Sequence, residues 1–273
     1  MAKVFVVDVA KCNGCCNCQV VCKDEHVGND WTPIAKPQPD TGQFWIKVNE
    51  KVRGSIPKVK ISYIPALCMH CDDAPCLAAC PDEAIYKRSD GLVIVDPVKC
   101  TGCRNCIDSC PYGALYFNWD LNIAQKCTGC AHLLDKGWKE PRCVDACPTE
   151  ALMFGEEDDF KEIISRAEML NPESKTKFRV YYLGLPKRFI AGAVYEPEED
   201  ECIEDATVSI TESDTGKEFA TRTDNFGDFW FEKLKVGSYD LLIEKEGYFP
   251  YQASAISTEK DNNVGDIKLY KRK

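Results

Sequence analysis

The sequence predicts an α+β chain in two parts: a cysteine-rich first half and an all-β second half. Three observations support this prediction. Of the 18 cysteines, all but Cys202 lie before residue 148. The cysteines of the first half recur at regular short spacings, with short strand and helix patterns between them. From about residue 188 the pattern changes to short alternating strands separated by turn signals, which is typical of a β sandwich.

Sixteen of the cysteines form four quartets, which leaves Cys16 and Cys202 over. The first and third quartets have the spacing C-x2-C-x2-C-x3-C, the second has C-x2-C-x4-C-x3-C and the fourth has C-x2-C-x12-C-x3-C. In chain order they are Cys12, Cys15, Cys18 and Cys22; Cys68, Cys71, Cys76 and Cys80; Cys100, Cys103, Cys106 and Cys110; and Cys127, Cys130, Cys143 and Cys147. A proline follows the last cysteine of three quartets, at Pro81, Pro111 and Pro148.

This spacing indicates [4Fe–4S] clusters, because three closely spaced thiolates hold one face of an iron–sulfur cube while the fourth reaches another cluster. A tetrahedral zinc site uses two separated pairs rather than three thiolates in a short run. A disulfide framework needs an oxidising compartment and is typical of small secreted domains. We therefore expect all sixteen cysteines to be iron ligands of four clusters, and we expect no catalytic residue in the chain.

Internal repeats support this interpretation. The segment 6–15 recurs as 94–103, and the segment 79–84 recurs as 146–151. In each unit we expect a strand that leads into the cluster loop, followed by a short helix and a second strand. Residues 84–95 alternate around an Asp-Gly pair, which predicts a hairpin.

Three kinds of residue border the quartets. Glycine precedes the second cysteine at Gly14, Gly102 and Gly129, where the missing side chain lets backbone N–H groups approach the cluster sulfurs. Lysine precedes the first cysteine at Lys11, Lys99 and Lys126. These lysines either solvate the surface or raise the potential of a nearby cluster by favouring its reduced form, and both interpretations stay open. For the histidines His26, His70 and His132 we expect packing or hydrogen-bonding roles.

We predict different positions for the two cysteines that lie outside the quartets. Cys16 is predicted to be a thiol without an iron, although a slip of the first quartet by one residue stays open. Cys202 is predicted to lie in or near the core of the second half.

The quartets and repeats resemble the four-cluster ferredoxin-like subunits of the dimethyl sulfoxide reductase family of molybdopterin enzymes. The resemblance implies a doubled bacterial-ferredoxin-like domain in which the quartets exchange their last members. The implied sets are Cys12, Cys15, Cys18 with Cys147; Cys127, Cys130, Cys143 with Cys22; Cys68, Cys71, Cys76 with Cys110; and Cys100, Cys103, Cys106 with Cys80. It also implies a molybdopterin cofactor, with molybdenum or tungsten, on a large partner subunit and not on this chain.

The second half adds a further resemblance. Its runs at 221–231 and 237–243 resemble a transthyretin-like, collagen-adhesin B-type sandwich. The domain order is similar to that of transhydroxylase-type small subunits of the same family. The segments 122–135 and 179–182 share this resemblance, which extends over nearly the whole chain. This implies a phenolic substrate for the partner. Relatives of that type can lose a cluster, whereas all four quartets are complete here, so hydroxylation, dehydroxylation and transhydroxylation all stay open.

We expect three segments along the chain. Residues 1–155 form the four-cluster domain, with an insertion at 23–67. Residues 156–187 form a helix and a connector, the amphipathic helix being predicted over 156–170. Residues 188–273 form the β sandwich. The insertion is too long for an ordinary loop, so it should pack on a partner subunit or cover the domain's own clusters.

Charge and hydropathy narrow the function classes. The net charge of −10, without a basic arm, argues against nucleic acid. The N-terminus lacks the apolar core of a signal peptide, and no segment approaches the roughly eighteen apolar residues of a membrane span. We therefore expect a cytoplasmic protein without a membrane anchor of its own, with co-export to the periplasm by a partner as the alternative.

The prediction is a non-catalytic electron-transfer subunit. It would relay electrons through four clusters to or from a large molybdopterin subunit, with an external electron carrier as a further partner. The alternative is a free-standing soluble polyferredoxin that serves several partners.

Overall fold

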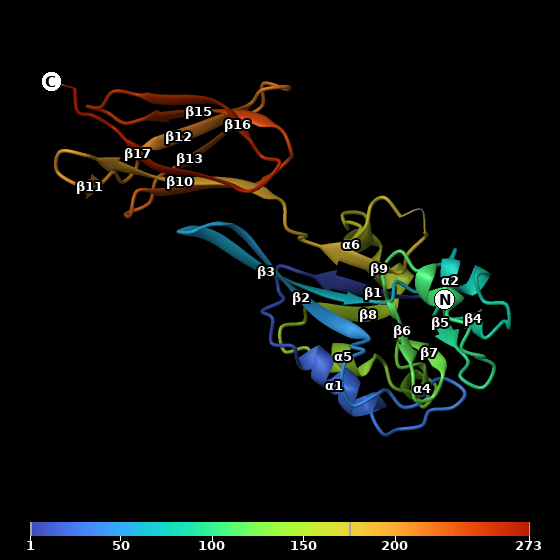
Figure 1. Ribbon diagram of the computed structural model, residues 1–273. Helices are drawn as coiled ribbons and strands as arrows, with labels where there is room; N and C mark the ends of the chain where they lie inside the picture. Colours follow the sequence, from blue (N-terminus) through green and yellow to red (C-terminus); the bar gives the residue numbers. More distant parts are fainter. Residues whose placement is uncertain (1, 175, 273) are drawn as a thin grey trace. The chain divides into compact units, whose positions relative to one another are not determined.

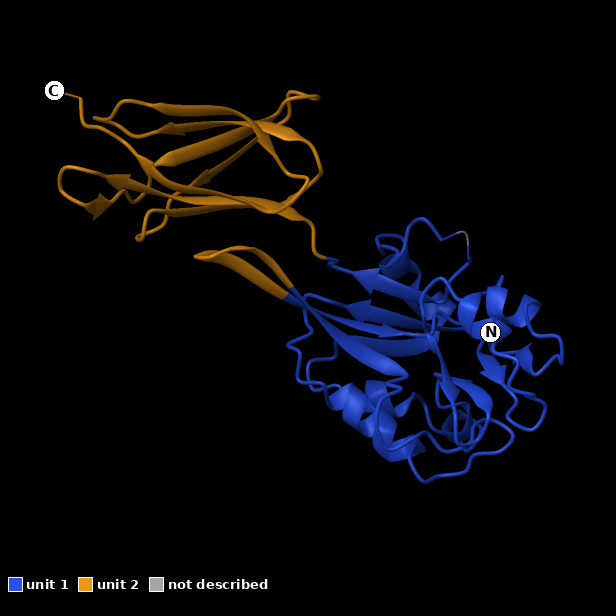
Figure 2. Ribbon diagram, in the orientation of Figure 1, with its two compact units in different colours: residues 1–51, 62–185 blue, residues 52–61, 186–273 orange. Residues whose placement is uncertain are grey.

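The computed structural model describes residues 2–174 and 176–272. The chain forms two compact units (Figure 2). The first unit comprises Met1–Lys51 and Ser62–Leu185, and the second comprises Val52–Ile61 and Pro186–Lys273. In the part that the structure describes, no helix is long and apolar enough to cross a membrane.

A three-stranded sheet joins the two ends of the first unit. Its central strand is the predicted first strand, β1 (Lys3–Asp8), whose apolar residues are buried. β1 pairs antiparallel with β8 (Leu152–Glu156) and parallel with β9 (Val180–Leu183) (Figure 1). β1 leads into the first quartet and β8 follows the fourth, with Val7 opposite Leu152. This pairing therefore brings the first and fourth quartets to one end of the sheet.

Short hairpins and short helices carry the quartets. The predicted hairpin around Asp90-Gly91 is confirmed, with Ile85 paired to Val95. The elements between β1 and β8 are α1 (Asn17–His26), β2 (Ile46–Ser55), β3 (Lys58–Leu67), α2 (Pro75–Ala78), β4 (Ile85–Lys87), β5 (Val93–Val95), α3 (Asn105–Asp108), β6 (Leu115–Asn118), β7 (Ile123–Lys126), α4 (Ala131–Leu134) and α5 (Arg142–Asp145). Each quartet thus follows a strand and is linked to the next strand by a helix, as the repeats predict, except that the fourth quartet has two helices.

The helix predicted over 156–170 is wrong in length. The chain forms a 3-10 helix, η1 (Glu157–Phe160), and one turn of α-helix, α6 (Lys161–Ile164), and neither contains a buried residue. Beyond them the backbone of Glu168 pairs with Tyr182 of β9, through N–H···O bonds of 2.7 and 3.2 Å. A short helix without a buried face has little to stabilise it, so pairing with the strand determines the conformation.

The insertion at 23–67 packs at least partly on its own domain. Helix α1 extends into it as far as His26. Trp31 stacks on His132 with the ring centroids 4.5 Å apart, and the buried Trp45 lies against His26 at 4.6 Å. These tryptophans therefore contribute to the core of the first unit.

The second unit is the predicted β sandwich. One sheet contains β10 (Arg188–Glu196), β11 (Glu201–Cys202), β14 (Asp228–Leu234) and β17 (Asn262–Lys268); the other contains β12 (Thr207–Glu212), β13 (Glu218–Arg222), β15 (Ser238–Glu244) and β16 (Tyr251–Ser257). Alternate residues of β12 and β15 are buried, as expected for strands with one face on a core. The turn signals of the sequence, at 214–216, 224–227, 235–237 and 246–247, fall between successive strands from β12 to β16.

The expected position of Cys202 is wrong. Both residues of β11 are exposed. β11 pairs only with β10 in the described structure, so it is a two-residue edge strand and its side chains remain in solvent.

The tip of the β2–β3 hairpin belongs to the second unit. Arg53 forms an ion pair with Asp261 at 3.0 Å, and Lys58, whose side chain is 7% exposed, pairs with Asp228. Lys60 lies 4.8 Å from the centroid of the Trp230 ring. Ion pairs and cation–π contacts thus accompany the packing of this tip within the unit.

Substitution of Gly54 tests whether the hairpin tip is closely packed within the second unit. Its φ is +88°, and an added Cβ would lie 2.3 Å from the Lys58 carbonyl oxygen and 2.6 Å from the Phe189 ring. Gly54→Ala should therefore lose about 1–2 kcal/mol for the left-handed backbone and a further 1–3 kcal/mol for the overlap. Gly216→Ala, at φ +68° in open space, should lose only the backbone part. Urea unfolding measures both, and equal losses would contradict this account of the tip.

Candidate cluster-binding sites

The sixteen candidate cysteines come together in four groups, and each group combines two quartets. Two of the groups are defined by the hollow that their four cysteines line together, and the other two by thiols that raise one another's pKa, although effects of the same kind also join neighbouring groups. Group 1 is Cys12, Cys15, Cys18 and Cys147; group 2 is Cys22, Cys127, Cys130 and Cys143; group 3 is Cys68, Cys71, Cys76 and Cys110; group 4 is Cys80, Cys100, Cys103 and Cys106. These are the sets that the family resemblance implies, and their role as iron ligands stays a prediction.

Groups 3 and 4 each surround a hollow. The four cysteines of group 3 line one hollow together with Tyr112 and Leu115. The four cysteines of group 4 line another together with Ile85 and Val95. Four sulfurs around a mainly apolar hollow fit a cube-shaped cluster, which takes one thiolate at each iron.

Group 1 combines the first three cysteines of the first quartet with the last cysteine of the fourth quartet. Burial, together with the nearby Cys12 and Cys147, raises the pKa of Cys18 to about 12. Cys147 differs from its neighbours. Burial alone would raise the pKa of Cys147, but the backbone N–H groups of Leu152 and Thr149 outweigh it and lower the pKa. Cys147 is thus held where a thiolate is favoured.

Group 2 is the most enclosed. Burial raises the pKa of Cys130 to about 12, and it raises the pKa values of Cys22 and Cys143 well above the ordinary value. Repulsion among the members of the group adds to burial in each case. Four such thiols are stable as thiolates only when cations lie among them, and the irons of a cluster supply that charge.

Backbone N–H groups point at several of these sulfurs. Such bonds stabilise a thiolate and tune a cluster. Examples are Gly129 N to Cys127 Sγ at 3.4 Å, His70 N to Cys68 Sγ at 3.5 Å and Ala124 N to Cys100 Sγ at 3.4 Å. The residue before the second cysteine has a positive φ in every quartet, at Gly14, Gly102, Gly129 and His70. The predicted role of the glycines is therefore supported by their backbone conformation, and a histidine takes the same place in the second quartet.

His70 has a packing role, as expected. It is buried, it stacks on Phe5 with ring centroids 6.1 Å apart, and its Nδ1 accepts a hydrogen bond of 3.0 Å from Val93 N–H. Burial, assisted by the charge of Lys126, lowers the pKa of His70 well below its usual range. The ring is therefore neutral, with its proton on Nε2.

The other two histidines lie together. The His26 and His132 rings are 5.2 Å apart, and burial lowers the pKa of His26 to about 3. His132 Nε2 is 2.9 Å from a carboxylate oxygen of Glu25. Arg142 also reaches Glu25, at 3.5 Å. Packing and hydrogen bonding thus explain both rings without iron.

Cys16 can be compared with its counterpart in the third quartet. Its Sγ donates a hydrogen bond to the Gly14 carbonyl at 3.4 Å, and its φ is +59°. Arg104 stands at the equivalent position with φ +67°. Because an arginine cannot ligate iron, the repeat favours Cys15 over Cys16 as the ligand.

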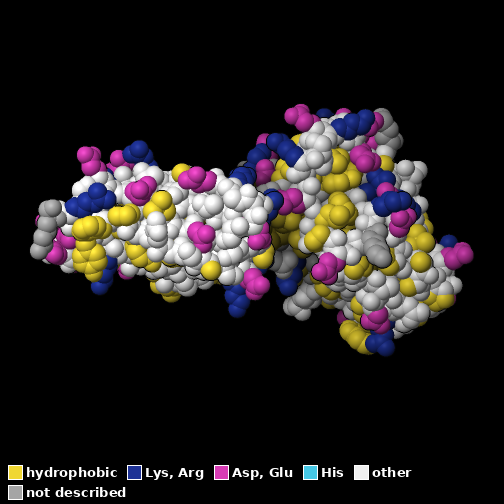
Figure 3. Space-filling view, turned by 90° about the horizontal axis from the view of Figure 1, so that it is seen from above, with side chains coloured by type: hydrophobic (Ala, Val, Ile, Leu, Met, Phe, Trp, Pro, Cys, Tyr) yellow, Lys and Arg dark blue, Asp and Glu magenta, His cyan; other side chains and the backbone are white. Residues whose placement is uncertain are grey.

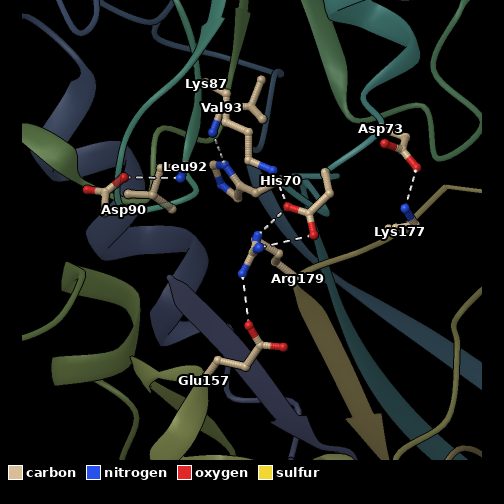
Figure 4. Close-up of polar contacts among 10 residues, drawn as sticks. His70, Asp73, Lys87, Asp90, Leu92, Val93, Glu157, Lys177 and Arg179 are labelled. Atoms are coloured by element: carbon tan, nitrogen blue, oxygen red, sulfur yellow. Dashed lines mark hydrogen bonds and ion pairs between the residues drawn. The ribbon is translucent and has the colours of Figure 1, made fainter. Parts of the chain in front are cut away.

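A segment that sequence analysis missed crosses the loop of the second quartet. Asp72 N–H donates to the Lys177 carbonyl at 2.6 Å, and Arg179 N–H donates to the Met69 carbonyl at 2.9 Å. The Arg179 guanidinium binds both carboxylate oxygens of Asp72, at 2.6 and 3.0 Å, and reaches Glu157 at 3.2 Å (Figure 4). This 176–179 segment is fixed over the loop by backbone and side-chain contacts together.

The same segment reaches group 3 itself. Thr176 Oγ1 lies 2.9 Å from the hydroxyl of Tyr112, which lines the group 3 hollow. Burial raises the pKa of Cys71, and a hydrogen bond with Thr176 opposes part of that rise. The sequence showed only a basic, aromatic connector here, because its partners lie about a hundred residues earlier.

The four groups are linked in series. Helix α1 carries Cys18 of group 1 and Cys22 of group 2. Cys68 of group 3 raises the pKa of Cys127 of group 2, after the larger effect of burial. Helix α2 joins group 3 to group 4. The series therefore runs from group 1 through groups 2 and 3 to group 4.

The two ends of the series reach the surface. Cys15 of group 1 and Cys103 of group 4 are exposed, whereas the members of groups 2 and 3 are buried or half-buried. Charges of both signs are interspersed over the molecular face seen in Figure 3.

The fold and the thiol groups define an iron–sulfur protein of the ferredoxin type. Residues 59–157 match the family described as 4Fe-4S dicluster domain, and residues 190–270 match the carboxypeptidase regulatory-like domain. The pyrogallol hydroxytransferase small subunit of Pelobacter acidigallici is 38% identical and covers 97% of this chain and 98% of its own. The arsenate respiratory reductase iron-sulfur subunit ArrB of Shewanella sp. strain ANA-3 is 33% identical over 66% of this chain and 94% of its own. One polypeptide of the anaerobic dimethyl sulfoxide reductase of Escherichia coli K12 is 36% identical over 58% of this chain and 75% of its own.

The chain belongs to the family of iron–sulfur subunits of the dimethyl sulfoxide reductase type. The predicted fold class, a ferredoxin-like domain followed by a transthyretin-like sandwich, is confirmed. The predicted role as an electron-transfer subunit with [4Fe–4S] clusters is confirmed as well. The number of clusters, their individual ligands and the predicted domain boundaries stay predictions.

The substitution Arg179→Gln tests whether the side chain of Arg179 fixes the 176–179 segment over the loop of the second quartet. The Arg179 side chain is 13% exposed, and its loss leaves Asp72 and Glu157 with fewer partners. We expect a loss of about 1–3 kcal/mol in the free energy of unfolding, measured by anaerobic urea titration. Lys177→Gln is the control, because the Lys177–Asp73 pair is at the surface and should contribute about 0.5 kcal/mol or less. Equal effects of the two substitutions would show that Arg179 does not fix the segment.

Proposed function

We propose that the chain carries one [4Fe–4S] cluster on each of groups 1 to 4 and relays electrons along this series to or from a molybdopterin catalytic subunit. The observation that carries the proposal is the linked series of four thiol groups with an exposed cysteine at each end. When bound, a cluster supplies reversible one-electron transfer.

The residues of the chain set the conditions for that transfer. The thiols of each group fix the position of a cluster on short helices and loops. Backbone N–H groups, such as those of Gly129 and His70, stabilise negative charge on the sulfurs. Burial of groups 2 and 3 keeps water away from the middle of the series. Within this proposal, no residue of the chain takes part in bond chemistry.

For the partner we propose a phenolic substrate. One relative over nearly the whole chain is named for the transfer of a hydroxyl group to pyrogallol. Four complete quartets, with the series open at both ends, suit a net hydroxylation or dehydroxylation that exchanges electrons with an external carrier. Transhydroxylation is redox-neutral overall, and we keep it as an equal alternative to hydroxylation and dehydroxylation. The names of other relatives, arsenate and dimethyl sulfoxide reductases, indicate that the substrate is set by the partner subunit.

Iron content tests the cluster assignment. Anaerobically isolated protein should contain about sixteen irons per chain, because each of four cubes holds four. Cys15→Ser should remove about four of them or leave a three-iron cluster visible by electron paramagnetic resonance. Cys16→Ser and Cys202→Ser should leave the iron content unchanged. Iron loss in Cys16→Ser with none in Cys15→Ser would reverse the assignment of the first quartet.

Co-purification tests the partner assignment. A tag on this chain should recover a stable complex with one large subunit that contains molybdenum or tungsten, detected by elemental analysis. A brown, iron-loaded monomer with no tightly bound partner would instead identify a free polyferredoxin. That result would refute the subunit proposal while leaving the clusters in place.

A further inference from the structure

Lys126 is a buried cation without a carboxylate partner. It is 2% exposed and lies at the end of β7, immediately before the first cysteine of the fourth quartet. Its Nζ donates hydrogen bonds to two backbone carbonyls, those of Val93 and Cys127, the second at 2.8 Å. Among residues 2–174 and 176–272, no Asp or Glu forms an ion pair with it. Lys58, which is also buried, pairs with Asp228.

An isolated ammonium group in the interior is costly, and carbonyl dipoles compensate only part of that cost. A buried ammonium group is therefore stabilised by negative charge nearby. The neighbouring imidazole of His70 is neutral and adds none. The groups that provide negative charge here are the thiolates of groups 2 and 3.

Lys126 stands where the loops of groups 2 and 3 meet. Val93 joins them, since its carbonyl accepts from Lys126 Nζ and its N–H donates to His70 of the group 3 loop. Val93 also lines the group 3 hollow, and Cys127, whose carbonyl accepts the second hydrogen bond from Lys126 Nζ, belongs to group 2. One cation thus faces both inner groups.

We propose that Lys126 is the shared counter-ion of the two inner clusters and raises the reduction potentials of both. The inference rests on the proposed function, because it requires clusters on groups 2 and 3. Reduction adds one electron to a cluster and no bond forms or breaks, so one unit of negative charge appears beside Lys126. A positive charge between the two clusters stabilises the added electron on either of them, in a dry interior where solvent screens little.

The internal repeat supplies matched controls. Lys11 and Lys99 precede the first cysteines of the first and third quartets just as Lys126 precedes that of the fourth. Both are exposed. Water and salt screen a charge at the surface, so these two lysines should affect potentials little. Of the two interpretations that the sequence left open, surface solvation thus suits Lys11 and Lys99, and control of potential suits Lys126.

The test is redox potentiometry with electron paramagnetic resonance on the anaerobically purified, cluster-loaded full chain, together with any partner that co-purifies. Lys126→Met should make two of the four reductions at least tenfold less favourable, a fall of about 59 mV for a one-electron couple. Lys126→Arg should restore most of that difference, because the charge is kept. Lys11→Met and Lys99→Met should leave all four potentials near the wild-type values. The shift in Lys126→Met should persist from low to high salt.

The outcomes separate this inference from the proposed function. Unchanged potentials in an iron-replete Lys126→Met variant, or equal shifts in the Lys11 and Lys99 variants, would overturn the role of Lys126 and leave the clusters standing. If Lys126→Met does not retain its iron, Lys126→Gln and Lys126→Arg take its place, and equal potentials in those two would overturn the inference. Wild-type protein with far fewer than about sixteen irons would overturn the proposed function itself.

Discussion

Mutual repulsion among buried thiolates is the constraint on which the first unit depends. Groups of four cysteines are withdrawn from water, and both burial and crowding raise the pKa values of Cys18, Cys76 and Cys130 to about 12. Such an arrangement is tenable when positive charge and hydrogen-bond donors surround the sulfurs. The positive-φ turns before the second cysteines and the N–H···S bonds supply hydrogen-bond donors. The buried Lys126 supplies positive charge. The first unit accordingly contains little regular secondary structure. The chain between quartets consists largely of loops and short elements that direct hydrogen-bond donors and thiols inward.

Much of the site could be predicted because its information is local. Ligand spacing, the glycine before the second cysteine and the proline after the fourth are all contained within a dozen residues, so the quartets and the cluster type follow from the sequence. The exchange between quartets is not local. Cys147 meets Cys12 because β8 pairs with β1, across nearly the whole first unit. Spacing alone cannot show that pairing, and only the family resemblance supplied it.

Errors arose where tertiary contacts outweigh local pattern. The apolar stripe from Phe160 to Leu170 has helical spacing, but α6 ends at Ile164 without a buried residue, and beyond it the backbone pairs with β9 while Leu170 packs on the core. Cys202 was expected near a core because cysteine is commonly buried, yet it lies on a two-residue edge strand. The 176–179 segment went unnoticed for the converse reason. Its residues look like an ordinary connector, and their importance comes from Asp72 and Tyr112, far away in sequence.

The position of β1 has a consequence for biosynthesis. Within the first unit, β1 is made before both strands that flank it, β8 and β9. At elongation rates of roughly 5–20 residues per second, about 7–27 s separate the synthesis of Cys12 from that of Cys147. Throughout that interval the first three thiols have no fourth member and the nascent apolar strand has no neighbour. Under the proposed function, a cluster on group 1 can therefore be completed only after the whole unit has been translated.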